Sequence, residues 1–561
     1  MNNIKIMDEI LSNKIAAGEV VEKCVSVVKE LVENSIDAGS KKIKIELLES
    51  GVKEIKVVDD GKGMDYEDAS LAFQRHATSK IYDEEDLYRI HSLGFRGEAL
   101  PSIASISNVV MKTSTGDIGT EINIKGGKEV YKKKCEARKG TIIIINDLFY
   151  NTPARLKHLS SLYSELANVV EFVNKIALSY PSISFTLLND NKVIFNTDGS
   201  NNQLKVINKI YGLEISKKMI EINGSNDDYE INGYICYPEI TKSNRNHIIT
   251  LVNNRVVKNI ELNRVINDCY HTYKPEDRYP IVVINIYVDP TLIDVNIHPT
   301  KQDIKFSKMD QLKEIIISSI EEGLSSIRLI PKVENKEIEK ATLYEEIRMD
   351  FGRVNEEVEE ENIDVSSDKL PELYPVGVVR GTYIVCQNDM GMYLIDQHAA
   401  KERVNYEYYK KVIGKCNDVT SMLFPINIEL PYNEYIIIKQ NINILESLGF
   451  TVEDFGQNTL IFRSHPIWLP IGNEEEAIKK ILDLIVVKEK EFNIDRFNER
   501  IAITLSCKMS IKANENISFK EMESLIQQLN NCSNPYTCPH GRPTVIFYSY
   551  YEIEKLFKRV V

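Results

Sequence analysis

Histidine, cysteine and carboxylate side chains in the last third of the chain have the types and spacing of a metal site. His398 and Glu402 are four residues apart, so a helix would project both from one face. Asp396 stands just before them, where it can cap that helix and also bind the same ion. Cys538 and His540, which we expect at the start of a strand, add a thiolate and an imidazole further along the chain. Zinc favours such a mixture of imidazole, thiolate and carboxylate ligands.

Further residues of the same region extend this candidate site. Cys507 offers a second thiolate, and Lys512 and Arg542 carry the charge needed to hold a phosphate group nearby. The plainer interpretation of a histidine and a glutamate at this spacing is a surface hydrogen bond. The two cysteines and the second histidine are what turn the pattern into a candidate metal centre.

The first hundred residues hold a second group, which suits a nucleotide. The chain has no GxxxxGK[ST] sequence, so the phosphate loop of P-loop enzymes is absent. Instead Asp59, at the end of an apolar β-run over Ile55–Val58, is followed by Gly61 and Gly63. A carboxylate there can accept a hydrogen bond from an amino group on a ring, while the glycines let the backbone approach the ligand.

A helix and two further segments accompany this strand. Val28–Asp37 has apolar residues at helical spacing, which places Glu30 and Asn34 on its polar side. Arg75–Lys80 and Gly94–Leu100 follow, and the second is a glycine-hinged loop that runs into a helix and offers backbone N–H groups to phosphate. Each pattern alone has a plainer interpretation, an ordinary turn or a solvated helix face.

Composition limits the class of protein without deciding it. A chain of 561 residues is too long to fold around one hydrophobic core, which predicts several domains. Its content of 43% hydrophobic and 27% charged residues is typical of a soluble globular protein. The start lacks the apolar core of a signal peptide, and the longest apolar runs, such as Ile142–Ile145 and Ile281–Val288, are strand-sized. Nine scattered cysteines favour a reducing cytoplasm. The net charge of −14 alone argues against a nucleic-acid binder, although local basic patches bind phosphate.

One acidic segment divides the chain into two folded lobes. Lys332–Leu370 is polar and acidic, which predicts a solvated linker; an exposed acidic helix over Lys336–Met349 is the alternative. Strand and amphipathic-helix signals alternate before it. After it, strands over Gly381–Gln387 and Met392–Ile395 lead to a helix that begins near Gln397. The predicted fold class is α+β with several domains.

In this order and spacing, the N-terminal patterns resemble the ATPase superfamily shared by gyrase, the heat-shock chaperones, histidine kinases and MutL. The sequence motifs are most similar to those of the MutL family of DNA mismatch-repair proteins, and the resemblance covers nearly all of residues 1–330. The segments that carry the resemblance are IAAGEVVE at 15–22, ELVENSIDAG at 30–39, DDGKGM at 59–64, RHATSK at 75–80, GFRGEAL at 94–100 and LFYNTPAR at 148–155.

The resemblance implies a domain order. It begins with an α/β-sandwich ATPase domain of the Bergerat type and an S5-like βαβ second domain. A flexible acidic linker and an α/β dimerisation and endonuclease domain follow. The implied boundaries are 1–210, 211–330, 331–372 and 373–561.

The resemblance also implies a role for each matching residue of an ATP site. Glu30 matches the general base that polarises the attacking water, and Asn34 matches the Mg²⁺ ligand. Asp59 matches the residue that binds the adenine amino group. Lys301, in the loop after the strand over Ile281–Val288, matches the lysine that contacts the γ-phosphate. The remaining ATP-binding positions are Gly61, Gly63, Thr78, Gly94, Phe95, Arg96 and Gly97.

Three C-terminal segments resemble the nuclease-active bacterial branch of the same family. They are DQHAAKERVNYE at 396–407, SCKMSIK at 506–512 and CPHGRP at 538–543. That branch is thought to use a regulatory zinc and one or more Mn²⁺ or Mg²⁺ ions for phosphodiester hydrolysis. The resemblance implies catalysis by Asp396, His398 and Glu402. The full implied ligand set is Asp396, His398, Glu402, Glu407, Cys507, Cys538 and His540.

Partners follow from the same resemblance. They are DNA, the mismatch-recognition protein MutS and a second copy of the chain, and a membrane is not among them. The expected location is the cytoplasm, near the nucleoid. Members of the family usually carry a docking peptide for the replication sliding clamp that begins with Gln. Here Thr420–Pro425 has the apolar part of that peptide without the Gln. It is either a degenerate clamp motif or a buried edge strand.

Two functions compete at this point. One is an ATP-driven dimeric clamp that couples mismatch recognition to strand nicking; the other is an ATP-gated matchmaker without a nuclease. The patterns at 396–407 and 538–543 favour the nuclease. A gyrase-like topoisomerase or a sensor kinase is disfavoured, because the sequence has no transmembrane sensor, no phospho-acceptor histidine before the ATPase patterns and no long cleavage domain.

Overall fold

The structure is a computed structural model, and it describes most of the chain. The described residues are 21–80, 93–94, 97–159, 161–271, 273–274, 278–294, 304–325, 369–414, 418–456, 458–487, 493–510, 517–557 and 559. The expected linker over 331–372 lies outside them except for its last four residues.

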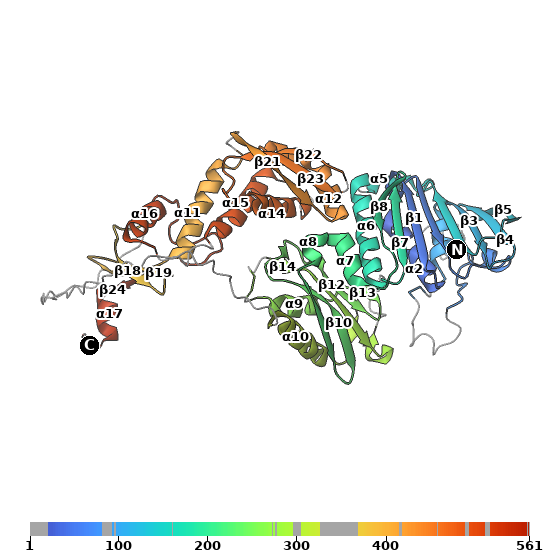
Figure 1. The fold of residues 1–561 in the computed structure, drawn as a ribbon, viewed down its shortest axis with the longest axis horizontal. Coiled ribbons are helices and arrows are strands. Elements are labelled where there is room, and N and C mark those ends of the chain that lie inside the picture. Colours follow the sequence, from blue (N-terminus) through green and yellow to red (C-terminus); the bar gives the residue numbers. More distant parts are fainter. Residues whose placement is uncertain are drawn as a thin grey trace, which may run out of the picture. The chain divides into compact units, whose positions relative to one another are not determined.

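The chain divides into two compact units (Figure 1). The first combines residues 1–326 with 417–492, and the second combines residues 327–416 with 493–561. The sequence places residues 373–561 in one domain, and that boundary stays a prediction. The α+β, multidomain fold class is confirmed, since both units contain helices and mostly antiparallel sheets.

An eight-stranded sheet forms the start of the first unit. The strand order is β5-β4-β3-β6-β2-β1-β7-β8, so that β5 and β8 are its edges. All neighbours are antiparallel except β1 and β7. Helices α2 and α6 pack on this sheet, as Figure 1 shows. The bounds are β1 Lys42–Leu48, β2 Glu54–Asp59, β3 Asn108–Ser114, β4 Gly119–Lys125, β5 Lys128–Cys135, β6 Gly140–Asn146, β7 Ser184–Asn189, β8 Lys192–Asn196, α2 Cys24–Asp37, α3 Asp68–Leu71, α4 Ala99–Ser105, α5 Pro153–His158 and α6 Leu162–Ser179.

Helix α2 explains how the sequence positions the candidate ATP-site residues. Val28, Leu31 and Val32 recur at helical spacing and are buried against the sheet and α6. The helix begins at Cys24, four residues before the predicted Val28. Cys24 and Val27 continue its helical spacing and are buried, and the backbone N–H of Cys24 donates to Glu165 Oε2 at 3.2 Å. That acceptor satisfies one of the donors that every helix start leaves free.

The second part of the first unit is built on a five-stranded sheet of order β13-β12-β15-β10-β9. β12 and β15 are parallel, and the chain between them contains α9. This crossover confirms the βαβ unit predicted for this region. The bounds are α7 Gln203–Tyr211, α8 Leu213–Ser216, β9 Met219–Ser225, β10 Tyr229–Cys236, β11 Thr241–Lys242, β12 Ile248–Val252, β13 Arg255–Val257, α9 Ile260–Cys269, β14 Tyr279–Pro280, β15 Val282–Val288, β16 Ile293–Asp294, β17 Lys305–Phe306 and α10 Met309–Ser325.

Residues 418–487 form a small sheet of order β21-β23-β22 with three helices. β21 is an edge strand of this sheet, and its register with β23 shifts between Ser421 and Ile426. The bounds are β21 Val419–Glu429, α12 Tyr432–Gln440, α13 Ile442–Ser447, β22 Thr451–Asp454, β23 Thr459–Pro466 and α14 Glu474–Val486.

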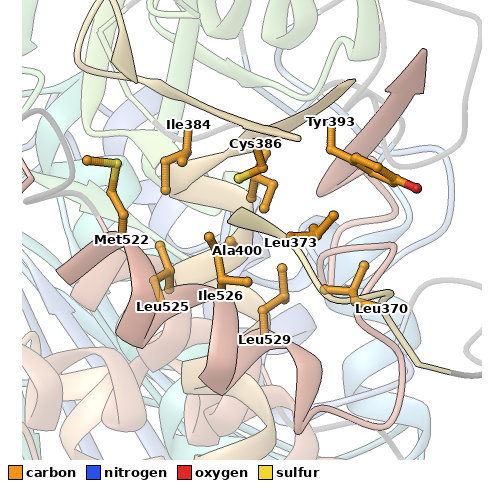
Figure 2. Close-up of a cluster of buried hydrophobic side chains, with 11 residues drawn as sticks. Leu370, Leu373, Ile384, Cys386, Tyr393, Ala400, Met522, Leu525, Ile526 and Leu529 are labelled. Atoms are coloured by element: carbon orange, nitrogen blue, oxygen red, sulfur yellow. The ribbon is translucent and has the colours of Figure 1, made fainter. Parts of the chain in front are cut away.

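The second unit packs α16 on a four-stranded antiparallel sheet of order β18-β19-β20-β24. Met522, Leu525 and Leu529 of α16 lie on one helix face and meet Ile384, Cys386 and Tyr393 of the sheet (Figure 2). Ala400, near the start of α11, belongs to the same core and anchors that helix. The bounds are β18 Tyr374–Val379, β19 Tyr383–Asn388, β20 Gly391–Asp396, α11 Gln397–Val412, α15 Ile494–Ser510, α16 Phe519–Asn530, β24 Val545–Ser549 and α17 Tyr550–Leu556.

Among the residues that the structure describes, no helix has the length and apolar character to cross a membrane.

Candidate nucleotide and metal sites

Asp59 ends β2 with a carboxylate that is buried and hydrogen-bonded on both oxygens. Oδ1 accepts from the backbone N–H of Gly61 at 2.9 Å and of Thr141 at 3.2 Å. Oδ2 accepts from the hydroxyl of Ser35, on α2, at 3.0 Å. Burial raises the pKa of Asp59 above its usual range, and these hydrogen bonds act in the opposite direction. The carboxylate is therefore held in place as a buried hydrogen-bond acceptor.

The two glycines after Asp59 let the chain pass where a side chain would collide. A Cβ at Gly63, whose φ is +72°, would lie 2.0 Å from the carbonyl oxygen of Ser114. A Cβ at Gly61 would lie 2.8 Å from the Cβ of Ala38. Both contacts are closer than side chains adopt, so this wall requires glycine.

The predicted helix places Glu30 and Asn34 one turn apart, on the half-buried side of α2. Asn34 Oδ1 accepts a hydrogen bond from Lys80 Nζ at 2.9 Å. Lys80 also pairs with Asp37 at 2.6 Å. Asp37 and Lys80 were not predicted as site residues, although each belongs to a segment that carries the family resemblance. The available signal for Asp37 was its position three residues after Asn34, on the same side of the helix.

Two loops that are separate in sequence meet at Gly97. Its carbonyl oxygen accepts from the N–H of His76 at 3.1 Å, and a Cβ at Gly97 would lie 2.5 Å from the carbonyl oxygen of Ala77. The loop then enters α4 at Ala99, as predicted. Thr78, in the first loop, accepts from the N–H of Lys80 at 3.2 Å. Three further expected ATP-binding residues, Phe95, Arg96 and Lys301, lie outside the described residues.

In the second unit, α11 begins at Gln397, as the sequence predicts. Asp396 caps it, because Oδ1 accepts from the N–H groups of His398 at 2.9 Å and Ala399 at 3.0 Å. One turn further, His398 Nε2 lies 3.3 Å from Glu402 Oε1. The cap and the pair place three of the predicted ligands at the first turns of one helix.

A second segment brings the remaining donors to Glu402. Cys538 and His540 lie in a tight loop in which Cys538 N donates to the carbonyl oxygen of Arg542 at 2.8 Å. His540 Nδ1 lies 3.4 Å from Glu402 Oε2. The ligand atoms of Glu402, Cys538 and His540 all lie within 4.8 Å of one another. Imidazole, thiolate and carboxylate donors at this separation fit a zinc or another transition-metal ion.

One local expectation was wrong. The sequence predicted Cys538 and His540 at the start of a strand, but β24 begins only at Val545. The loop is instead closed by a bridge between Thr537 and Pro543. Arg403 of α11 holds it, since its Nε donates to the carbonyl oxygen of Thr537 at 2.5 Å. Arg403 was not predicted as a site residue, because nothing in the local pattern marks Thr537, its partner far along the chain.

The carboxylate of Glu407, another predicted ligand, is hydrogen-bonded to the turn at Ser533 and Asn534. Its carboxylate accepts from the N–H and the hydroxyl of Ser533 at 2.8 Å each and from the N–H of Asn534 at 3.3 Å. Burial opposes its ionisation, but these hydrogen bonds and Arg403 hold the pKa of Glu407 below its usual range. The structure therefore does not bring Glu407 into the group around Glu402. The side chain of Cys507 and all of Lys512 lie outside what the structure describes.

The segment considered for clamp docking, Thr420–Pro425, lies on β21. Leu423 is 88% exposed and Phe424 is 82% exposed, at the point where the register with β23 shifts. Although β21 is an edge strand of its sheet, the side chains of these two residues are exposed rather than buried.

Comparisons with known proteins cover the whole chain. Residues 22–128 match the family model "Histidine kinase-, DNA gyrase B-, and HSP90-like ATPase", residues 207–325 match "DNA mismatch repair protein, C-terminal domain", and residues 376–517 match "MutL C terminal dimerisation domain". The DNA mismatch repair protein MutL of a Geobacillus species is 43% identical over 100% of both chains. The MutL protein of Listeria monocytogenes serovar 1/2a is 43% identical over 99% of both chains.

Solved structures also match the N-terminal part. The N-terminal domain of a DNA repair protein is 24% identical with a TM-score of 0.49, and covers 56% of this chain and 98% of its own. The Aquifex aeolicus MutL ATPase domain complexed with ADP is 22% identical with a TM-score of 0.37, and covers 53% of this chain and 98% of its own. With relatives that are 43% identical from end to end, the chain belongs to the MutL family of DNA mismatch repair proteins.

Proposed function

We propose that this mismatch-repair protein is an ATP-driven dimeric clamp that nicks DNA with a metal-dependent endonuclease site in its second unit. The observation that carries the nuclease is the meeting of Glu402, Cys538 and His540 within 4.8 Å, with the carboxylate and the thiol buried. Donors of three chemical types converge there from segments 138 residues apart. An accidental surface hydrogen bond between His398 and Glu402 does not account for that convergence.

Each residue of this site then has a distinct part. Asp396, His398 and Glu402 are the proposed catalytic residues, and Cys538 and His540 hold the zinc together with Glu402. Glu407 and Cys507 remain proposed members of the ligand set, although Glu407 contacts Ser533 instead. A bound divalent ion, zinc or Mn²⁺, supplies a Lewis acid for phosphodiester hydrolysis. Arg403 positions the loop through Thr537.

In the ATPase domain, Glu30 is the proposed general base and Asn34 the proposed Mg²⁺ ligand. Asp59 would accept the adenine amino group, in line with its buried and fully oriented carboxylate. The N–H groups of the loop around Gly94 and Gly97, together with Thr78, would face the phosphates. Phe95, Arg96 and Lys301 are proposed from the sequence alone.

The match to a MutL dimerisation domain supports a homodimer. Apolar side chains that the second unit leaves exposed on β18, β24 and α17 supply a candidate face for it. Those that are at least two-fifths exposed are Tyr374, Val376, Val379, Ile546, Phe547, Tyr550, Tyr551 and Leu556, and Phe557 follows directly after α17.

We further propose DNA, MutS and the replication sliding clamp as partners, in the cytoplasm at the nucleoid. Exposure of Leu423 and Phe424 favours clamp docking over a buried edge strand. The domain boundaries 1–210, 211–330, 331–372 and 373–561 remain part of this proposal.

The nuclease is tested with supercoiled plasmid, Mn²⁺ and the intact chain. Asp396→Asn is nearly isosteric and keeps an acceptor for the helix cap, but it removes the charge of a metal ligand. We expect it to abolish nicking and to leave ATP hydrolysis near the parent rate, because the two chemistries belong to different units. His398→Ala and Glu402→Lys should do the same. If Asp396→Asn nicks as well as the parent, the site is not catalytic and the chain is an ATP-gated matchmaker.

A further inference from the structure

Lys80 contacts two side chains of α2, that of Asn34, the proposed Mg²⁺ ligand, and that of Asp37. Its ammonium is 2.9 Å from Asn34 Oδ1 and 2.6 Å from Asp37 Oδ2. Asn34 and Asp37 are three residues apart on α2 and present these oxygens on one side of the helix. The Lys80 and Asp37 side chains are only 20% and 10% exposed, so this is a shielded pair rather than a surface one.

The surroundings of this ammonium are polar and tightly shaped. The N–H groups of Leu93 and Gly94 donate to the two oxygens of Asp37 at 2.9 and 3.1 Å. A Cβ at Gly94 would lie 3.3 Å from Lys80 Nζ and 3.5 Å from Asn34 Oδ1. A side chain at Gly94 would therefore press directly on the Lys80–Asn34 contact.

An amide oxygen and a carboxylate oxygen that share one cation are the kind of pair that Mg²⁺ or Mn²⁺ also binds. Two cations cannot share that space without strong repulsion, since the shielding that strengthens the Lys80–Asp37 attraction strengthens repulsion equally. An ion that arrives alone must displace the ammonium. An ion that arrives with a nucleotide brings phosphate charge, which can neutralise the displaced lysine.

We propose that Lys80 is an internal counter-cation that occupies the divalent-ion position of the ATPase site until nucleotide arrives, and so makes metal binding depend on nucleotide. The proposal rests on the proposed role of Asn34 as metal ligand. Lys80 is a positioning residue in this scheme, acting through Asn34 and Asp37. Metal and nucleotide would consequently enter the site together.

The test measures Mn²⁺ binding to the full chain by the loss of the free-ion electron paramagnetic resonance signal, with and without a non-hydrolysable ATP analogue. All variants carry Asp396→Asn and His540→Ala, which weaken Mn²⁺ binding in the second unit. In this background, Lys80→Met should raise nucleotide-free Mn²⁺ affinity at least about tenfold, as expected from removing one nearby like charge. Adding Asn34→Ala to Lys80→Met should abolish that gain and so locate the ion.

Two control variants separate charge from position. Lys80→Arg keeps the charge and should leave nucleotide-free Mn²⁺ binding weak. Lys29 lies on α2 and pairs with Glu33 at 3.8 Å. Lys29→Met should therefore leave nucleotide-free Mn²⁺ binding unchanged. Circular dichroism of each variant verifies the fold.

The failures are distinguishable. If Asn34→Ala leaves Mn²⁺–nucleotide binding unchanged, Asn34 is not the metal ligand and the proposed site itself is wrong. If Asn34→Ala weakens that binding but Lys80→Met does not raise nucleotide-free Mn²⁺ affinity, the metal site stands and the counter-cation role of Lys80 is overturned.

Discussion

His540 Nδ1 lies 3.4 Å from Glu402 Oε2, although 138 residues separate the two. Glu402 is 3% exposed, so its carboxylate meets both His398 and His540 in a place that water reaches poorly. A buried carboxylate between two imidazoles and a thiol is costly without a shared positive charge. A bound metal ion would supply such a charge.

Zinc retention follows from this arrangement. Cys538→Ser and His540→Ala each remove one donor of the group and should weaken zinc binding about tenfold or more, since oxygen and methyl groups replace thiolate and imidazole poorly. Zinc remaining after dialysis against a chelator, measured by atomic absorption, is the readout. Cys532→Ser is the matched control, because Cys532 is a buried cysteine that donates to the Gln528 carbonyl oxygen instead. Equal zinc loss in all three variants would contradict the assignment.

Glu30→Ala should bind ATP but hydrolyse it at least ~100-fold more slowly, the usual scale for losing a general base. Phosphate release under saturating ATP measures the rate, and equilibrium binding of a non-hydrolysable analogue measures affinity. Lys29→Met, at the adjacent position on α2, should leave turnover near that of the parent. Unchanged turnover in Glu30→Ala would remove the base assignment, and lost ATP binding would indicate a structural role.

Asp59→Asn should lower the affinity for ATP about tenfold or more, because the amide nitrogen would confront the adenine amino group with a donor. The preference for ATP over inosine triphosphate, which lacks that amino group, should shrink in the same variant. Calorimetry with both nucleotides measures this. Asp60→Asn is the control, since Asp60 Oδ1 accepts from the N–H groups of Lys41 and Lys42 and an amide oxygen can replace it. An unaltered preference in Asp59→Asn would place adenine elsewhere.

The hydrogen bonds of Glu407 predict a pH dependence. The pKa of Glu407 is lowered below the ordinary 4.5. The charged carboxylate therefore stabilises the folded state fully above about that pH, and this stabilisation is lost as the pH falls through the lowered pKa. Glu407→Gln should speed exchange of the Ser533 and Asn534 amide hydrogens about 5- to 30-fold at pH 7, the effect of a weakened charged hydrogen bond. The difference from the parent should shrink below pH 4.

Mass spectrometry of peptides that cover 533–534 measures this exchange, after correction for intrinsic rates. Glu521→Gln, in the exposed capping box of α16, should leave it unchanged. A difference that stays constant down to the lowest pH would show that the charge of Glu407 does not stabilise the turn.

Local patterns predicted those parts of the fold whose causes are local. The apolar spacing of α2, the β-run that ends in Asp59, and the start of α11 at Gln397 each depend on neighbouring residues, and each was predicted. The earlier start of α2 was not predicted. The first backbone N–H of this helix donates to Glu165, 141 residues away, which a local pattern does not show.

The candidate sites show the same division. Ligand chemistry, together with the resemblance of three segments to the nuclease-active branch, predicted Cys538 and His540 in one group with Glu402. The contact of Glu407 with Ser533 depends instead on how distant segments pack. Lys80 was quoted only as part of a pattern, because a sequence does not show which oxygens its ammonium will reach. Side-chain types thus predicted the members of a site better than their contacts.

The edge strand β5 has a consequence for self-association. Its residues are mostly exposed, and Lys128, Lys132, Lys133 and Lys134 lie along it. Two copies that tried to extend the sheet through this edge would bring eight ammonium groups together, which opposes strand-to-strand polymerisation. The β5 edge of this eight-stranded sheet is therefore protected by its charge from pairing with the same edge of a second copy.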